Sequence, residues 1–302
     1  MILKQNYKAY LLIGYAFLLI IHFILKDRIF PLSIFFYGFP LIIIIGITVF
    51  LIILFYKRQW YRYSLIAIFT VLTIIWYDNY YFQTNTNYEG NTTKILYWNL
   101  AKRNQLPVDI ISEKVNNYQP EILAFVEAPE KTLKNLNALK SALPNYNFTI
   151  LKGAMLVAAK GNIVFLNFEY QEDSYKANLL EVTTTSEKIK FIVTDLTSNL
   201  LVNKKRPMTF VSDFAKRETV DFITGDFNSV YESIYFNELK NNFTSFHKYN
   251  NGFTATWPLG IPLLEIDHFW LSHKHQPIQL IKFQNNASDH AMLISEFKFN
   301  RN

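Results

Sequence analysis

Apolar residues are concentrated at the N-terminal end of the chain, in three runs separated by short charged segments. The first run (9–25) has 17 consecutive uncharged residues and the second (29–56) has 28. A helix needs roughly 17–25 such residues to cross the hydrocarbon core of a membrane. The third run (63–77) reaches that length only if the aromatic residues on either side lie at the two membrane interfaces. The pattern therefore predicts a membrane anchor over residues 1–82, with three transmembrane helices at about 9–25, 30–56 and 61–82.

An alternative for the third run is a buried helix of a soluble domain. A helix of that kind normally keeps a polar face towards water. Residues 63–77 contain no charged side chain, which favours the transmembrane interpretation.

Charge is also distributed unevenly along the chain. Residues 1–82 carry seven Lys or Arg and two Asp or Glu, which leaves 23 basic and 22 acidic residues in the rest. The formal net charge of +6 therefore belongs to the membrane end and does not by itself indicate a nucleic-acid-binding domain. The complete absence of cysteine excludes disulfides, thiolate catalysis and zinc–cysteine sites.

The basic residues of the anchor predict its orientation. With three spans, the N-terminus and segment 57–62 share one side of the membrane and hold five basic residues, Lys4, Lys8, Lys57, Arg58 and Arg62. The positive-inside rule places that side in the cytoplasm and the C-terminal domain outside it. If only two segments span, the predicted side is reversed.

A polar linker is expected at 83–93, followed by one domain over 94–302 in which short β-rich runs alternate with amphipathic stretches. Many strands with few helices indicate two sheets packed face to face with helices outside. Strands are predicted at 95–99, 122–126, 155–159, 163–168, 178–183, 190–194, 222–224, 266–271, 278–283 and 292–297, and helices at 108–118, 130–143, 207–216 and 230–239.

Polar residues end or follow several of these strands. Glu127 comes directly after five apolar residues, where a carboxylate is costly unless it is paired or bound to a metal. Taken alone, the sequence Gly-Asp-Phe-Asn at 225–228 is typical of a turn. It is accompanied, however, by four other polar strand ends, at Asn99, Glu127, Asp267-His268 and Ser288-Asp289-His290.

These motifs, in this order, resemble those of the endonuclease/exonuclease/phosphatase superfamily over about residues 94–299. The stretch 253–258, Phe-Thr-Ala-Thr-Trp-Pro, is similar to a bacterial subgroup whose members often have a membrane-spanning N-terminus. The resemblance implies a four-layered α/β sandwich of the DNase I-like type and an integral protein of the bacterial inner or plasma membrane. It also implies a hydrolase that cleaves a phosphoester by metal-assisted attack of water.

The resemblance assigns roles to individual residues of the site. Glu127 and Asp289 would hold or lie beside a divalent cation, Mg²⁺ or Mn²⁺, which oxygen ligands suit. The predicted roles of the others are as follows: Asn99 places Glu127 and the phosphate, Asp226 positions or deprotonates the attacking water, Asn228 binds phosphoryl oxygens, and His290 contacts the scissile phosphate with its tautomer fixed by Asp267.

One position departs from the family pattern. Asp195 stands where many members have a catalytic His at the end of the preceding strand. A carboxylate repels phosphate unless it is protonated or bound to a cation. The alternative function is therefore a catalytically impaired module that binds a phosphate-containing ligand or acts as a sensor, and Asp195 could instead recruit a second cation.

The remaining candidates are assigned more ordinary roles. Arg206 either contacts a phosphate or is solvated at a helix N-terminus. We expect His268 to be structural, His273 and His275 to lie at a solvated strand end, and Trp257 to pack in a loop. The expected partners are the lipid bilayer and a phosphoester substrate, which is a nucleic acid, a nucleotide or a phospholipid headgroup.

Overall fold

The structure, a computed structural model, describes residues 3–84, 88, 90–184 and 187–300. The chain divides into two compact units, Met1–Tyr81 with Glu232–Ile234, and Phe82–Tyr231 with Tyr235–Asn302. Within the expected linker 83–93, residues 85–87 and 89 lie outside the described ranges.

The N-terminal unit is helical. Two of its helical segments, Tyr7–Leu25 and Gln59–Tyr80, are long and apolar enough to cross a membrane. The 14-residue α3 is also apolar, but at 1.5 Å per residue it is only about 21 Å long, short of a hydrocarbon core of about 30 Å. The helices in chain order are α1 (Leu3–Ile20), its π-helical continuation η1 (Ile21–Leu25), α2 (Ser33–Gly38), α3 (Leu41–Leu54) and α4 (Gln59–Tyr80).

The second predicted span therefore differs from expectation. Residues 30–56 do not form one helix. Turns occupy the start of this segment, and the helical structure is interrupted again between α2 and α3. Pro40 is the N-cap of α3, and proline has no N–H to continue a preceding helix. Among the described residues, two helical segments rather than the predicted three are thus long enough to cross a membrane. The third predicted run is one of them, because it lies in the 22-residue α4.

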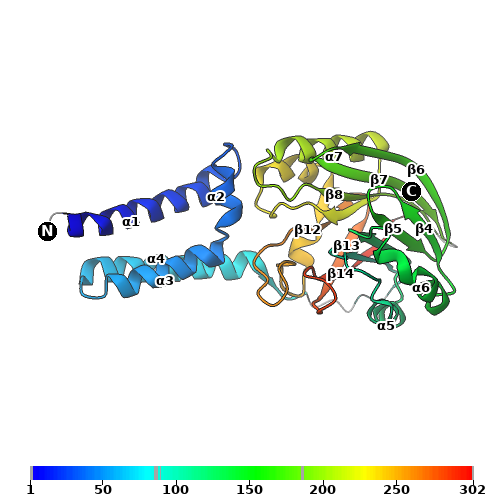
Figure 1. The fold of residues 1–302 in the computed structure, drawn as a ribbon, viewed down its shortest axis with the longest axis horizontal. Coiled ribbons are helices and arrows are strands. Elements are labelled where there is room, and N and C mark those ends of the chain that lie inside the picture. The colour runs from blue at the N-terminus through cyan, green and yellow to red at the C-terminus, as the bar shows by residue number, and fades with distance from the viewer. Residues whose placement is uncertain (1–2, 85–87, 89, 185–186, 301–302) are drawn as a thin grey trace. The chain divides into compact units, whose positions relative to one another are not determined.

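The C-terminal unit is built on two six-stranded mixed sheets (Figure 1). The first has the order β13-β14-β2-β3-β5-β4 and the second β10-β12-β9-β8-β7-β6. Their strands are β2 (Thr93–Asn99), β3 (Ile122–Val126), β4 (Asn147–Leu151), β5 (Met155–Ala159), β6 (Asn162–Gln171), β7 (Tyr175–Thr183), β8 (Lys188–Leu196), β9 (Phe222–Asp226), β10 (Phe243–Ser245), β12 (Asp267–Ser272), β13 (Gln276–Phe283) and β14 (Met292–Lys298); β1 (Tyr81–Phe82) and β11 (Gly252–Phe253) have two residues each.

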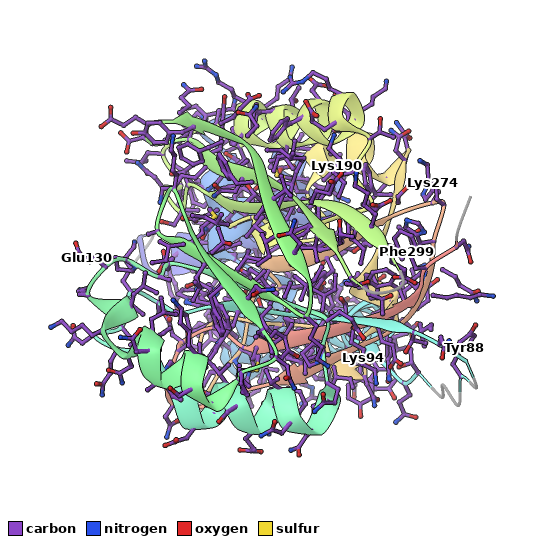
Figure 2. All side chains as sticks on the ribbon, turned by 90° about the vertical axis from the view of Figure 1, so that its right-hand side faces the viewer. Tyr88, Lys94, Glu130, Lys190, Lys274 and Phe299 are labelled. Carbon is purple, nitrogen blue, oxygen red and sulfur yellow. The ribbon has the colours of Figure 1, made fainter. Side chains whose placement is uncertain are left out.

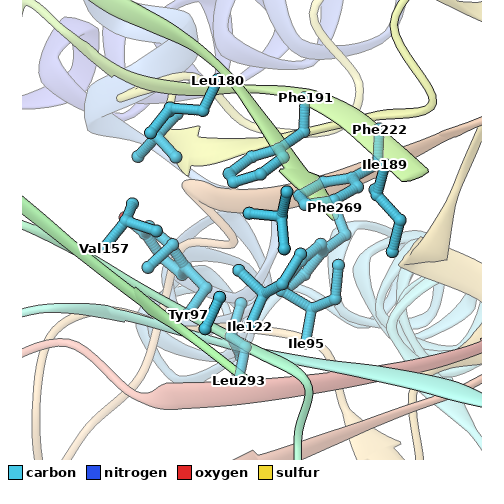
Figure 3. Close-up of a cluster of buried hydrophobic side chains, with 14 of the residues drawn as sticks. Ile95, Tyr97, Ile122, Val157, Leu180, Ile189, Phe191, Phe222, Phe269 and Leu293 are labelled. Carbon is cyan, nitrogen blue, oxygen red and sulfur yellow. The ribbon is translucent and has the colours of Figure 1, made fainter. Parts of the chain in front are cut away.

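The two sheets pack face to face. Alternate residues of β2 point to opposite sides, so Ile95 and Tyr97 enter the core between the sheets while Leu96 and Trp98 face the helices outside. Across the inter-sheet core, Phe191, Phe222 and Phe269 of the second sheet face residues of the first (Figure 3). Both faces of the central strands are thus buried, which accounts for their nearly continuous apolar sequences.

Helices complete a four-layered arrangement. Figure 2 shows α7 along one side of the two sheets, with α5 and α6 along the other. Residues of α5 and α6 join the cluster on the outer face of the first sheet, and residues of α7 join that on the second. The helical segments are α5 (Val108–Tyr118), η2 (Thr132–Asn135), α6 (Leu136–Ala142), α7 (Lys205–Glu218), η3 (Ile234–Phe236), α8 (Asn237–Lys240) and η4 (Phe246–Tyr249).

The predicted α/β sandwich is therefore confirmed, but some of its elements differ. The strands at 122–126 and 155–159 and the helix at 108–118 have the predicted bounds. The helix predicted over 230–239 is wrong, since only η3 and the four-residue α8 form there. Strands β4 and β10 were not predicted.

Candidate active site

Three carboxylates lie next to one another at the end of the second sheet. In the strand register, Asp226 of β9 is the partner of Asp195 on the parallel β8 and of Asp267 on the antiparallel β12. Gly225 precedes Asp226, and a Cβ there would lie 2.0 Å from the backbone oxygen of Thr194. Glycine is therefore required for β8 and β9 to approach closely enough to bring these acids together.

The end of β2 in the first sheet contributes Asn99. Its side-chain amide donates to Oδ2 of Asp226 at 3.0 Å, and its Oδ1 accepts from the backbone N–H of Ala101 at 2.8 Å. The backbone N–H of Asn228 donates to the other oxygen of Asp226 at 2.8 Å. Asp226 is thus fixed from both sheets.

Glu127 and Asn228 each follow the end of a strand with a left-handed backbone, at φ 53° and 47°. This conformation is uncommon for residues other than glycine, and it concentrates at functional sites that the surrounding structure over-determines. Glu127 accepts from Lys102, whose ammonium lies 3.2 Å from its Oε1.

Asp267 and His290 form a hydrogen-bonded pair beside Asp226. Nδ1 of His290 donates to Oδ2 of Asp267 at 2.9 Å, and Nε2 lies 3.9 Å from Oδ2 of Asp226. The hydroxyl of Tyr97 donates to Oδ1 of Asp267 at 2.9 Å. Asp267 thereby fixes the orientation of the imidazole, with Nε2 on the side of Asp226.

The buried charges shift the proton affinities of these groups. Burial raises the pKa of Asp226 well above its usual value, and the neighbouring charges of Asp267 and Asp195 raise it further. Burial by itself would lower the pKa of His290, but Asp267, Asp226 and Asp289 together raise it to about 10. The imidazole is therefore a cation at neutral pH, next to a carboxyl group with a high affinity for a proton.

Two places in the site offer side chains that could hold a metal ion. Ligand atoms of Asp226, Asp267 and His290 lie within 4.8 Å of one another, but both oxygens of Asp267 and Nδ1 of His290 already take part in hydrogen bonds. Asp289 is different. Its Oδ2 accepts from Trp257, whereas its Oδ1 is buried and has no hydrogen-bond partner within the described part of the chain. A buried carboxylate oxygen without a partner fits a cation ligand.

Asp195 is paired with a lysine. Nζ of Lys176, the register partner of Asp195 on β7, lies 3.0 Å from its Oδ2. Burial raises the pKa of Asp195, Lys176 opposes that shift, and Glu127 adds to it. Asp195, which stands where many family members have a histidine, therefore has a positive charge beside it.

The buried basic residue near the N-terminus of α7 is Lys204, whereas Arg206 is exposed. Lys204 donates to the backbone oxygen of Thr197. Burial lowers its pKa to about 8, and the charge of Asp226 partly opposes that shift. The predicted phosphate contact by Arg206 stays a prediction, and Lys204 is a further cation that lies in the electrostatic field of Asp226.

Of His268, His273 and His275, two have structural partners and one is exposed. Nε2 of His268 donates to the backbone oxygen of Ser229 at 2.8 Å, as expected for a structural residue. His275 is buried 3.0 Å from Oδ1 of Asp221, so the expectation of a solvated strand end holds only for His273, which is exposed. The side-chain amide of Asn228 donates to the backbone oxygen of Leu196, the last residue of β8.

Sequence reasoning missed several residues that hold the site. Tyr97 could have been found, because it lies two residues before Asn99 and hence on the same face of β2. Trp98 donates from its indole to the backbone oxygen of His290 at 3.0 Å, and Ser288 donates to the backbone oxygen of Asn99 at 2.7 Å. No periodic signal marks Lys204, because it lies outside any strand or amphipathic repeat.

Comparison with known proteins agrees with this architecture. The family model "Endonuclease/Exonuclease/phosphatase family" matches residues 96–290, so the chain belongs to that family. No curated protein matches the chain.

Solved structures with the same fold share little sequence with the chain. A family protein from Bacteroides thetaiotaomicron is 14% identical with a TM-score of 0.55, over 71% of this chain and 100% of that one. TDP2 from Caenorhabditis elegans is 15% identical with a TM-score of 0.54, over 70% and 77%. TDP2 from D. rerio, in complex with a single-strand DNA product, is 14% identical with a TM-score of 0.51, over 69% and 100%. At these identities the similarity shows the fold.

Proposed function

We propose that the chain is a membrane-anchored phosphoesterase that hydrolyses a phosphodiester with the help of a divalent cation. The observation that carries the proposal is the Asp226–His290–Asp267 cluster. A carboxyl group with raised proton affinity lies 3.9 Å from a buried imidazolium that a second carboxylate orients. This combination suits acid–base chemistry on an anionic substrate.

The roles proposed for these residues follow from their protonation. In its ionised form, Asp226 orients the attacking water and accepts its proton as the water oxygen bonds to phosphorus. The bond from phosphorus to the leaving oxygen breaks, and the leaving oxygen takes up a proton from solvent. Nε2 of His290 donates to a phosphoryl oxygen, while Asp267 keeps the ring charged and in place. Asn99 keeps Oδ2 of Asp226 in position, and the backbone N–H of Asn228 does the same for Oδ1.

Glu127 and Asp289 are the residues proposed to hold Mg²⁺ or Mn²⁺. The fit rests on Oδ1 of Asp289, which has no hydrogen-bond partner among the described residues, and on the all-oxygen donor set. When bound, the cation would neutralise charge on the phosphoryl group. In this structure Lys102 forms an ion pair with Glu127. When the cation binds Glu127, Lys102 would contact the substrate instead.

The pairing of Asp195 with Lys176 makes this position compatible with a bound phosphate, both for the enzyme and for the impaired binding module. The ammonium offsets the repulsion that a carboxylate would exert on a phosphate. The proposed substrate is a nucleic acid, a nucleotide or a phospholipid headgroup. The segments Tyr7–Leu25 and Gln59–Tyr80 are proposed as the anchor, in a bacterial inner or plasma membrane. The catalytic domain is proposed on the extracytoplasmic side if residues 30–56 also span the membrane, and on the cytoplasmic side if they do not.

The test is hydrolysis of bis-p-nitrophenyl phosphate by the full chain in detergent micelles, with Mg²⁺ or Mn²⁺ and with EDTA. We expect turnover that is abolished by EDTA and reduced at least 100-fold in Asp226→Asn, on the scale of general acid–base catalysis. Asp213→Asn, an exposed acid on α7, is the matched control and should retain activity. A folded protein that hydrolyses neither this compound nor DNA, RNA or phospholipid would support the binding module instead.

A further inference from the structure

The loop between β11 and β12 connects two ends of the candidate site. Within it, the backbone N–H groups of Thr256 and Trp257 both donate to the oxygen of Leu264, at 2.8 and 3.0 Å. Leu264 in turn donates to the oxygen of Trp257 at 2.9 Å. The loop is therefore closed by its own backbone hydrogen bonds, and its residues are held in defined positions.

Thr256 ties this loop to both acidic motifs. Its hydroxyl oxygen accepts from the backbone N–H of Asp267 at 3.3 Å and from that of Ile266 at 3.2 Å. Its backbone oxygen accepts from Ala291, directly after His290, at 2.9 Å. Thr256, in the Phe-Thr-Ala-Thr-Trp-Pro motif, is thus hydrogen-bonded to the backbone both at Asp267 and just after His290.

The side chain of Trp257 contacts Asp289, a residue of the proposed cation site. Its indole N–H donates to Oδ2 of Asp289 at 3.0 Å, and its ring centroid lies 6.5 Å from that of His290. An indole offers one donor and no acceptor. It can therefore hold one carboxylate oxygen but leaves the other, Oδ1, buried and without a partner within the described part of the chain.

We propose that Trp257 is a positioning residue for the cation site: its indole N–H holds Oδ2 of Asp289 so that Oδ1 is presented to the divalent cation. This inference rests on the proposed function. Groups that hydrogen-bond a metal ligand orient it, and their loss weakens metal affinity by roughly 10–100-fold. In their absence a carboxylate can rotate and lose its ligand geometry.

The test measures Mn²⁺ binding rather than turnover. The detergent-solubilised full chain is titrated with Mn²⁺, and the free ion is followed by electron paramagnetic resonance. Trp257→Phe keeps an aromatic ring but removes the N–H, and should raise the dissociation constant about tenfold or more, with an unchanged unfolding temperature in EDTA. Trp60→Phe is the matched control, because Trp60 is 82% exposed in α4. Wild-type Mn²⁺ affinity in Trp257→Phe would overturn the inference.

A second variant guards against a trivial effect on folding. Asp289→Asn removes the ligand charge, and adding Trp257→Phe to it should weaken Mn²⁺ binding no further, because both changes act on the same oxygen pair. Fully additive losses would show that Trp257 acts by another route and would overturn the inference. Mn²⁺ binding without turnover would reject the proposed hydrolysis and leave the role of Trp257 intact, whereas a wild-type chain that binds no Mn²⁺ would reject both.

Discussion

The ammonium group of Lys176 lies 3.0 Å from Oδ2 of Asp195, and the two residues are direct register partners on β7 and β8. The side chain of Asp195 is only 9% exposed and that of Lys176 is 35% exposed. The pair therefore places a compensated charge at the strand end where many family members have a histidine. Removing the charge of one partner and leaving the other should change both the stability and the activity of the protein.

Lys176→Met should destabilise the chain by about 1–3 kcal/mol, because it leaves a buried carboxylate without its partner. Equilibrium urea unfolding in detergent micelles, followed by circular dichroism, measures the effect. Lys188→Met is the control. Lys188 also forms an ion pair, 2.9 Å from Glu181, but is 66% exposed, so its loss should cost less than about 1 kcal/mol. If Asp195→Asn fails to recover stability in the Lys176→Met background, the pairing is not the cause.

Gly225→Ala should reduce both stability and activity. Its Cβ would lie 2.0 Å from the backbone oxygen of Thr194, so β8 and β9 would have to separate beside Asp226. Overpacking of this kind costs about 1–3 kcal/mol, measurable by the same urea unfolding. Gly14→Ala, with nothing within 4 Å of the added carbon, is the control. A Gly225→Ala protein as stable and active as the wild type would contradict the close approach.

The charge state of His290 predicts a pH dependence of stability. Its folded pKa of about 10 lies above the ordinary value of 6.5, so its contribution is fully present below pH 6.5 and is lost as pH rises towards 10. The stability difference between wild type and His290→Gln, measured in EDTA by urea unfolding, should shrink over that interval. His273→Gln, at an exposed position, should show no such trend. A difference that grows with pH would have the opposite sign and would reject the imidazolium.

The side of the membrane can be tested because the chain has no cysteine. Ser141→Cys places a single thiol at an exposed position of α6. If the C-terminal domain is extracytoplasmic, a membrane-impermeant maleimide should label this thiol in spheroplasts without lysis. Labelling only after lysis would place the domain in the cytoplasm, the side expected if only two segments span. The unmodified chain is the control for background labelling.

The sequence by itself determined the local elements and the chemical character of the strand ends. Continuous apolar runs such as Ile122–Val126 can only be buried on both faces, and the polar residue that follows each of them, such as Glu127, marks the edge where a strand ends. These signals are local, so they could be recognised from spacing alone, as could the apolar length of the first and third membrane runs. They did not reveal the loop structure of 230–239, where only η3 and the four-residue α8 form.

Only the tertiary structure decided which of these groups meet. The register between β8, β9 and β12 brings Asp226 beside Asp195, 31 residues earlier, and beside Asp267, 41 residues later, and no spacing rule in the chain states that register. The same holds for Lys176 beside Asp195 and for Trp257 beside Asp289. The physical reason is that burial and electrostatic partners depend on contacts between distant segments, while the sequence reports directly only on neighbours along the chain.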